Sequence, residues 1–220
     1  MIATIGELEQ VDGSSSLQFG ETKVITSVTG PIEVSRMKNE KPTQAFLDIN
    51  IRPASGVPTT REATLEAKLD DILQAMINVK QYPRQQLQIV VQIQRAGEPL
   101  SFTVLELSAI VNSVYLSLLD SGISLKSSFL ATSCVITQKG EVVLKPDGNQ
   151  LAASKSHHFV VYSLKNAKAD ELIFAESFGS FSEEELFTVY DKCATDIESQ
   201  NVEIRKIVAD SVKKDYTWKA

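Results

Sequence analysis

The sequence predicts an α/β fold in a single domain that spans residues 1–220. Short runs rich in Val, Ile, Thr and Phe, which are typical of strands, alternate with longer stretches in which apolar residues recur at helical spacing. No linker rich in Pro, Gly or Ser divides the chain, and its length suits one compact domain.

The strand candidates share β-branched and aromatic residues, and several alternate between apolar and polar positions. Leu47, Ile49 and Ile51 fall on one face of a strand because successive side chains point to opposite sides. The polar turn at 138–140 predicts a short hairpin between its flanking runs. The candidates are 22–28, 45–52, 86–94, 129–137, 141–145, 158–164 and 171–176.

Three helices are predicted from their first turns. Thr59 precedes Glu62 by three residues, and Thr103 precedes Glu106 by the same spacing. This is the capping-box pattern, in which the two residues satisfy each other's free backbone N–H groups. The third helix begins at Ser182, before a run of glutamates that suits the positive end of a helix dipole. Its pattern is long, and the sequence leaves open one bent helix or two in tandem.

Composition narrows the functional class. The net charge is −6, whereas a free-standing nucleic-acid binder is usually basic. The chain therefore either binds no nucleic acid or adds a few basic residues to a site that other chains complete. Cys134 and Cys193 have no nearby partner in the sequence, which favours a reduced, intracellular setting. We expect no membrane association, because no apolar run approaches the roughly 20 residues of a spanning helix.

The usual catalytic and ligand-binding patterns are missing. His157 and His158 are adjacent on a predicted strand, so they point to opposite faces and cannot share one metal or substrate. Cys134 lies in a strand where burial is the default for a free thiol. Neither a Gly-rich phosphate loop nor zinc-ligand spacing occurs. We expect no catalytic residue, no metal and no cofactor.

Basic residues give the strongest hint of a binding site. Arg36, Lys38 and Lys41 cluster in a segment of low apolar content between two strand candidates. Such a loop can contact a phosphate backbone without reading sequence, although the sequence alone favours a solvated loop without a ligand. Arg52 and Arg95 are the next candidates for RNA contact.

Sequence motifs add a family resemblance. "VDGSS" occupies residues 11–15, "GETKVITSVTGPIE" residues 20–33, "IRPA" residues 51–54 and "SLLDSG" residues 117–122. In this order they resemble the RNase PH family, and in detail the ring subunits of the eukaryotic RNA exosome, most of all a fungal one. The resemblance covers most of the chain.

The resemblance implies a single RNase PH-type domain of βαβ units with one left-handed crossover, here followed by the long C-terminal helix. It also implies partners: other RNase PH-like ring subunits, RNA-binding cap subunits, a separate processive ribonuclease, and RNA. The associated role is 3′-to-5′ RNA processing and degradation, including rRNA maturation, in the nucleus, nucleolus and cytoplasm.

Active members of the family phosphorolyse RNA from its 3′ end. The resemblance implies that they use an arginine at the start of the second helix and two aspartates before a later strand. The first position falls within residues 100–107 here, and no arginine occurs between Arg95 and Arg205. The aspartates match Gln150 and Ser156. The sequence therefore predicts a chain that is not an enzyme.

Two alternatives remain at this point. A phosphorolytic exoribonuclease could use a displaced or shared site, with an arginine recruited from Arg52, Arg95 or a partner chain. A homo-oligomeric RNA-binding protein outside any ring is also compatible with the residues.

Overall fold

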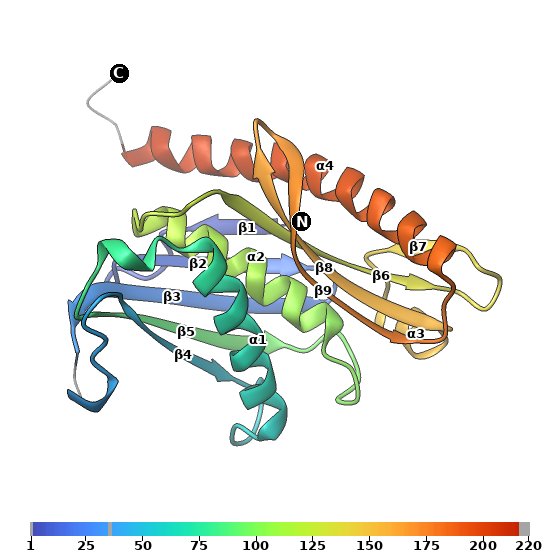
Figure 1. Cartoon of the computed structure of the whole chain (residues 1–220), viewed down its shortest axis with the longest axis horizontal. Coiled ribbons are helices and arrows are strands. Elements are labelled where there is room, and N and C mark those ends of the chain that lie inside the picture. The colour runs from blue at the N-terminus through green and yellow to red at the C-terminus, as the bar shows by residue number, and fades with distance from the viewer. Residues whose placement is uncertain (1, 35–36, 216–220) are drawn as a thin grey trace.

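The computed structural model describes residues 2–34 and 37–215. Over these residues the strands form two sheets (Figure 1). The first sheet consists, from edge to edge, of β1 (Ile2–Ile5), β2 (Gly13–Phe19), β3 (Thr22–Glu33), β5 (Gln85–Arg95) and β4 (Phe46–Arg52). The second consists of β7 (Val142–Leu144), β6 (Ser128–Ile136), β8 (Ser156–Lys165) and β9 (Lys168–Gly179).

Strand pairing is antiparallel in both sheets except between β4 and β5, which run parallel. The helix α1 (Thr60–Met76) connects these two strands and makes a βαβ unit. The predicted strands are confirmed as β3 to β9, with ends displaced by a few residues. The predicted hairpin at 138–140 is also confirmed, because it joins the antiparallel pair β6 and β7.

The first predicted capping box is confirmed. The Thr59 side chain accepts a hydrogen bond from the N–H of Arg61, and Glu62 accepts the backbone N–H of Thr59 at 2.7 Å. These bonds satisfy donors that the first turn leaves free. The apolar stripe that follows is buried against the first sheet: Leu65, Leu69, Ile72, Leu73 and Met76.

The helix α2 (Val104–Asp120) lies between the two sheets and is buried over 104–118. Its close approach to β2 depends on Gly13, where an added Cβ would lie 2.3 Å from the Ser117 carbonyl oxygen. The glycine of the "DGS" motif is therefore a packing requirement. The second predicted capping box is wrong, because the Thr103 side chain makes no cap hydrogen bond.

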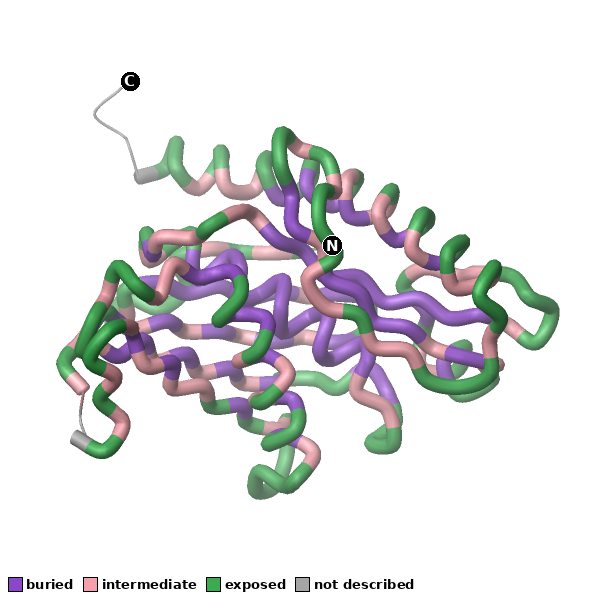
Figure 2. The backbone as a smooth tube through the Cα atoms, in the orientation of Figure 1, coloured by how far each residue is buried: buried purple, intermediate pink, exposed green. Residues whose placement is uncertain are grey.

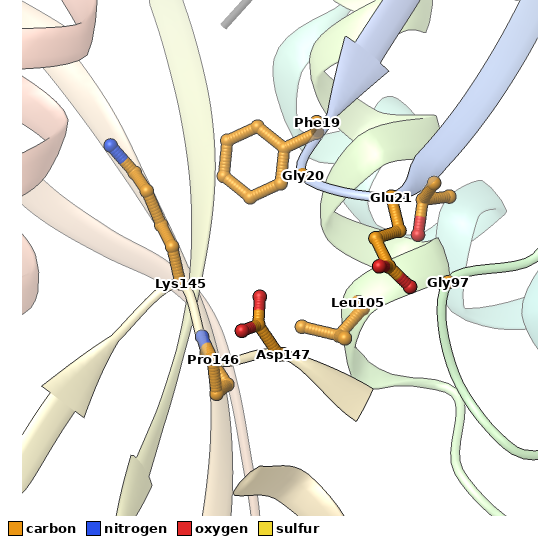
Figure 3. A pocket seen from close by; sticks show the side chains of 9 residues that line it. Phe19, Gly20, Glu21, Gly97, Leu105, Lys145, Pro146 and Asp147 are labelled. Atoms are coloured by element: carbon orange, nitrogen blue, oxygen red, sulfur yellow. The ribbon is translucent and has the colours of Figure 1, made fainter. Parts of the chain in front are cut away.

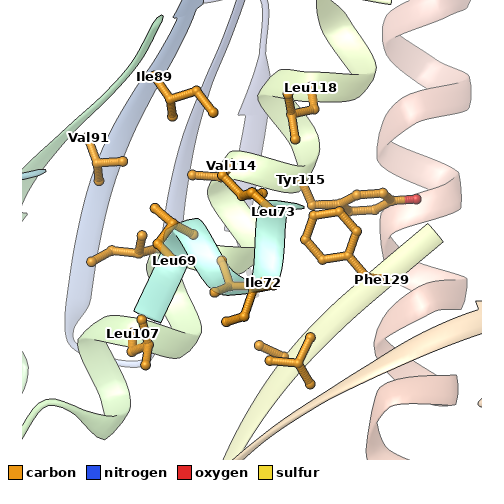
Figure 4. Close-up of a cluster of buried hydrophobic side chains, with 14 of the residues drawn as sticks. Leu69, Ile72, Leu73, Ile89, Val91, Leu107, Val114, Tyr115, Leu118 and Phe129 are labelled. Carbon is orange, nitrogen blue, oxygen red and sulfur yellow. The ribbon is translucent and has the colours of Figure 1, made fainter. Parts of the chain in front are cut away.

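The main hydrophobic core includes residues from β2 to the last helix and draws on both sheets. Figure 2 shows this buried layer along the middle of the molecule. Figure 4 shows side chains of α1, α2 and the strands meeting there, with the Tyr115 and Phe129 ring centroids 5.0 Å apart. Both faces of β6 are covered, which explains its unbroken burial from Phe129 to Ile136.

The long C-terminal pattern forms one helix, α4 (Glu183–Asp215), so two helices in tandem are excluded. Ser182 and Glu185 cap it reciprocally. The helix packs on the second sheet and brings the Cys193 Sγ atom to 3.4 Å from that of Cys134. Both thiols are free and buried, and tertiary folding brings them close together although they are far apart in the sequence. Among the described helices, none is long and apolar enough to cross a membrane.

The sequence reading missed β1, β2 and the short helix α3 (Gly148–Ala152). The strand β2 is rich in serines, which are uncommon in buried strands. They are tolerated because Ser15 Oγ donates to the Ser113 carbonyl at 2.8 Å and the hydroxyls of Ser113 and Thr26 lie 2.8 Å apart. Small polar side chains thus let β2 and α2 approach closely without leaving these hydroxyls unpaired.

Candidate functional site

The two segments in which the resemblance places catalytic residues meet in space. The beginning of α3 packs on the loop before α2, where a Cβ on Gly148 would lie 2.8 Å from the Gly97 carbonyl oxygen. Next to this contact lies an open hollow of about 320 Å³. Carboxylates are prominent in its lining, which includes Glu21, Glu98 and Asp147.

The N-terminus of α2 is capped by Glu98. Its two carboxylate oxygens accept the backbone N–H groups of Glu106 at 2.9 Å and Leu105 at 3.1 Å, and the side chain is fully buried. Free N–H groups at a helix N-terminus are a ready anion site. Here that site is filled by a carboxylate of the same chain, in the role that the sequence assigned to Thr103.

An arginine does reach the start of α2, but it comes from α1. Arg61 donates from Nη2 to the Phe102 carbonyl at 2.6 Å and from Nε to the Leu100 carbonyl at 3.1 Å. Its Nη1 lies 2.7 Å from Glu106 Oε2 and 3.5 Å from Glu62 Oε1. Each of the three guanidinium nitrogens is therefore engaged by the protein. Sequence reasoning missed Arg61, because its partners lie about forty residues further along the chain.

Burial sets the ionisation of this cluster. It raises the pKa of Glu98 to about 7, against the lowering effect of the two N–H donors. Burial also raises the pKa of Glu106, although Arg61 partly offsets it. Burial by itself would lower the pKa of Arg61, but the carboxylates of Glu106, Glu98 and Glu62 outweigh it and raise that pKa. The one guanidinium is thus shared among three acidic side chains and is not free to bind a phosphate.

The positions expected for the catalytic aspartates carry no carboxylate. Gln150 is exposed on α3 and accepts the Asp147 N–H at 3.1 Å. Ser156 is buried, with Oγ 3.0 Å from His158 Nε2. Within the described residues, no group of three His, Cys, Asp or Glu side chains is placed to hold a metal ion. Figure 3 shows Glu21 and Asp147 beside a second, smaller cavity of about 20 Å³.

The adjacent histidines point to opposite faces of β8, as predicted. His157 contacts the rings of Phe102 and Phe178, with ring centroids 5.2 and 5.3 Å away. His158 is buried, its Nδ1 2.8 Å from Ser177 Oγ. Burial lowers the pKa of His158 to about 4, so it is neutral at neutral pH. Both histidines are explained by packing.

The predicted RNA-binding residues fall into two groups at opposite ends of the first sheet. Lys38 lies in a 3₁₀ turn before β4 and is exposed, and Lys41 follows it. Arg36 lies outside the described residues. The loop is fixed to the segment before β5, because the Arg84 N–H donates to the Lys41 carbonyl at 3.1 Å. Arg84 is 72% exposed and Lys80 is also exposed, so the structure adds two basic residues that sequence reasoning missed.

The second group lies toward the other end of β5. Its more distant member, Arg95, is about 33 Å from Gln85, since β5 has eleven residues and a strand rises about 3.3 Å per residue. Arg52 is nearer, because it pairs with Gln92. Arg52 pairs with Gln92 across β4 and β5, and Arg95 pairs with Lys23 across β5 and β3. Arg52 and Arg95 are exposed at this end. Both residues therefore lie toward the end of the sheet that is farther from Lys38 and Lys41. We call the first group the loop end and the second the strand end.

Comparisons with known proteins agree with this fold. A family model described as "3′ exoribonuclease family, domain 1" (RNase PH) matches residues 1–124. The chain is 38% identical over 214 residues to "Exosome complex component RRP46" of Saccharomyces cerevisiae, with 96% of each chain covered. It is 33% identical over 208 residues to the Schizosaccharomyces pombe protein of that name, covering 93% of this chain and 87% of the relative.

Structural similarity leads to the same fold. The crystal structure of rice (Oryza sativa) Rrp46 matches with a TM-score of 0.77 at 24% sequence identity, over 90% of each chain. The motifs, the family match over more than half of the chain and the identity to the yeast proteins agree, and the chain belongs to the RNase PH family of 3′ exoribonuclease-related proteins.

Proposed function

We propose that this chain is a non-catalytic structural subunit of an RNA exosome ring, acting as one RNase PH-like domain over residues 1–220. The two yeast relatives are named as exosome complex components, and both align over nearly the whole chain. The proposed role is to complete the ring and to contribute to its RNA channel in 3′-to-5′ RNA processing and decay. A core shared by both sheets supports the single domain.

The occupied N-terminus of α2 is the observation that carries the non-catalytic part of the proposal. Phosphorolysis needs cations that hold inorganic phosphate and balance charge in the transition state. The helix N–H donors are instead used by Glu98, and Arg61 is used by backbone carbonyls and Glu106. A phosphate would have to displace a buried carboxylate and then sit beside a second one.

The proposed partners are other RNase PH-like ring subunits, RNA-binding cap subunits and a separate processive ribonuclease, in the nucleus, nucleolus and cytoplasm. Affinity purification of the tagged chain, with mass spectrometry of everything retained, tests this. We expect several RNase PH-like chains and cap proteins in near-equal amounts. Recovery of the chain alone, or only with itself, contradicts the ring assignment.

A direct assay tests the absence of catalysis. The homogeneous chain is incubated with 3′-ended RNA, inorganic phosphate and magnesium, and nucleoside diphosphates are measured. We expect none above background, in the wild type and in an Arg61→Lys variant alike. Release of diphosphates by the wild type that the Arg61→Lys variant loses would make Arg61 a catalytic arginine and overturn the proposal.

For RNA contact we propose Lys38 and Lys41 at the loop end and Arg52 and Arg95 at the strand end; Arg36 stays a prediction from the sequence. Lys38, Arg52 and Arg95 are exposed and Lys41 is partly exposed. Among the described residues none of these four side chains forms a salt bridge with a carboxylate, which supports their availability to phosphates. Replacing Lys38 and Lys41 with alanine is expected to weaken RNA binding and to flatten its salt dependence.

A further inference from the structure

The pairs of a lysine and an aromatic ring differ in whether a carboxylate neutralises the lysine. Among the described residues, a lysine lies over a phenylalanine ring in three places. In two of them a carboxylate neutralises the lysine: Lys68 Nζ is 2.6 Å from Glu176, and Lys145 Nζ is 2.8 Å from Asp196. These pairs are parts of internal salt-bridge networks, which explains their geometry without any external ligand.

The third pair is Lys41 over Phe46, with Nζ 5.8 Å from the ring centroid. Among the described residues no carboxylate lies within salt-bridge distance of Lys41, and no other aromatic ring stacks on Phe46. Of the three pairs, it is the one whose positive charge is not neutralised within the described part of the chain.

The position of Phe46 makes the ring accessible. It is the first residue of β4, an edge strand of the first sheet, and its neighbour Leu47 points into the core. Side chains alternate along a strand, so Phe46 lies on the sheet face opposite Leu47 and α1, which none of the described helices covers, and it is partly exposed there. The backbone beside it is fixed, because the Ala45 N–H donates to the Val79 carbonyl at 2.9 Å.

Two further cations lie on the segments that adjoin Lys41. Lys38 and Arg84 are exposed on the two segments that the Arg84 N–H to Lys41 carbonyl bond holds together. Glu40 lies 3.5 Å from Arg84 Nε and offsets part of its charge, yet Arg84 keeps 72% of its side-chain surface exposed. A single ring among cations is too small an apolar area for a protein interface. It fits a nucleic-acid strand, which offers a base to the ring and phosphates to the cations.

We propose that Phe46 is a stacking platform for one unpaired base of single-stranded RNA, and that Lys38, Lys41 and Arg84 contact the phosphates on either side of it. This rests on the proposed function in that RNA is the ligand. It adds a residue that is uncharged and that binds through a force independent of salt. Base stacking on an aromatic side chain tolerates any sequence, because every base has a π face.

The experiment measures binding of a 5′-labelled oligouridylate to the full-length chain, alone and in its reassembled ring, by fluorescence anisotropy between about 50 and 200 mM salt. Phe46→Leu keeps an apolar side chain and removes the ring. We expect a loss of affinity of about 5- to 150-fold, with an unchanged salt slope, because stacking is not electrostatic. Phe46→Trp is expected to restore binding. Lys38→Ala and Arg84→Ala are expected to lower the slope.

Phe178 provides a matched control. Its ring is 45% exposed and also has a lysine 5.8 Å from its centroid, but that lysine is paired with Glu176 and the ring is stacked on His157. Phe178→Leu is expected to bind RNA like the wild type. An equal loss in both variants would mean a general effect of removing a ring and would overturn the proposal.

The outcomes separate this proposal from the proposed function. Unchanged affinity of Phe46→Leu, together with weakened binding of Lys38→Ala, keeps RNA contact at the loop end and overturns stacking. If Phe46→Leu instead fails to enter the ring while binding RNA normally, the surface is a protein interface and stacking is again overturned. No binding of oligouridylate by the wild type, alone or in the ring, removes both proposals.

Discussion

Replacing Glu98 with glutamine removes the titrating proton from the group that caps α2 while nearly preserving its size. Burial raises the pKa of Glu98 to about 7 from its ordinary value of 4.5. The folded chain therefore holds this proton more tightly than the unfolded chain does. The stability that the bound proton confers is complete below about pH 4.5 and is lost as pH rises through about 7.

The size of the effect follows from the same values. Each pH unit between the unfolded and folded pKa changes the free energy of unfolding by about 1.4 kcal/mol, so the gap from 4.5 to about 7 corresponds to about 3 kcal/mol. Glu106 and the histidines also have shifted pKa values, but they are common to both proteins. The difference between wild type and Glu98→Gln isolates the contribution of Glu98.

Urea unfolding of both proteins, followed by circular dichroism from about pH 5 to about pH 8, measures this difference. We expect the wild type to lose about 3 kcal/mol relative to Glu98→Gln over that range, with the midpoint of the change near pH 6. A difference in unfolding free energy that is the same at both ends of the range would refute the reasoning. It would mean that the two helix N–H donors fully compensate burial and that Glu98 is ionised throughout.

Three further outcomes are expected. Gly13→Ala places a Cβ 2.3 Å from the Ser117 carbonyl oxygen and should destabilise the chain by about 3 kcal/mol or prevent folding, measured by urea unfolding beside the wild type. Thr59→Ala removes the α1 cap and should cost about 1 kcal/mol in the same assay, whereas Thr103→Ala should cost less because its side chain makes no cap bond. The hydrogen bond with Cys193 and burial raise the pKa of the Cys134 thiol, so iodoacetamide should label it only after unfolding; rapid labelling of the native chain, detected by mass spectrometry, would contradict this burial.

Much of the fold was predictable because local chemistry and tertiary packing agree there. Thr59 and Glu62 are three residues apart and need only each other to begin α1. The alternation in β4 survives because that strand has one covered and one open face. The serine-rich β2 was not predictable, since its serines are buried only by virtue of hydroxyl partners on α2, about one hundred residues away.

One part of the candidate site could be predicted from the sequence, and another part could not. The missing groups can be read directly from the residues: no arginine follows Arg95 before Arg205, and the positions that the resemblance assigns to aspartates hold Gln150 and Ser156. The absence of a residue type needs no geometry. The groups found in their place depend on folding, because Glu98 and Arg61 reach the start of α2 through contacts that no local pattern encodes.

Some of the basic residues could be grouped from the sequence, whereas others are grouped or separated only by the fold. Lys38 and Lys41 stand out in the sequence because they are close together in a loop. Three other features depend on how the chain folds. Arg84 joins their group through its backbone bond to Lys41. Strand pairing places Arg52 and Arg95 toward the far end of the sheet and leaves Phe46 partly exposed beside Lys41. The types and the order of residues are known from the sequence. The distance between residues far apart in sequence is set by the sheet register and by packing, which exist only in the folded molecule.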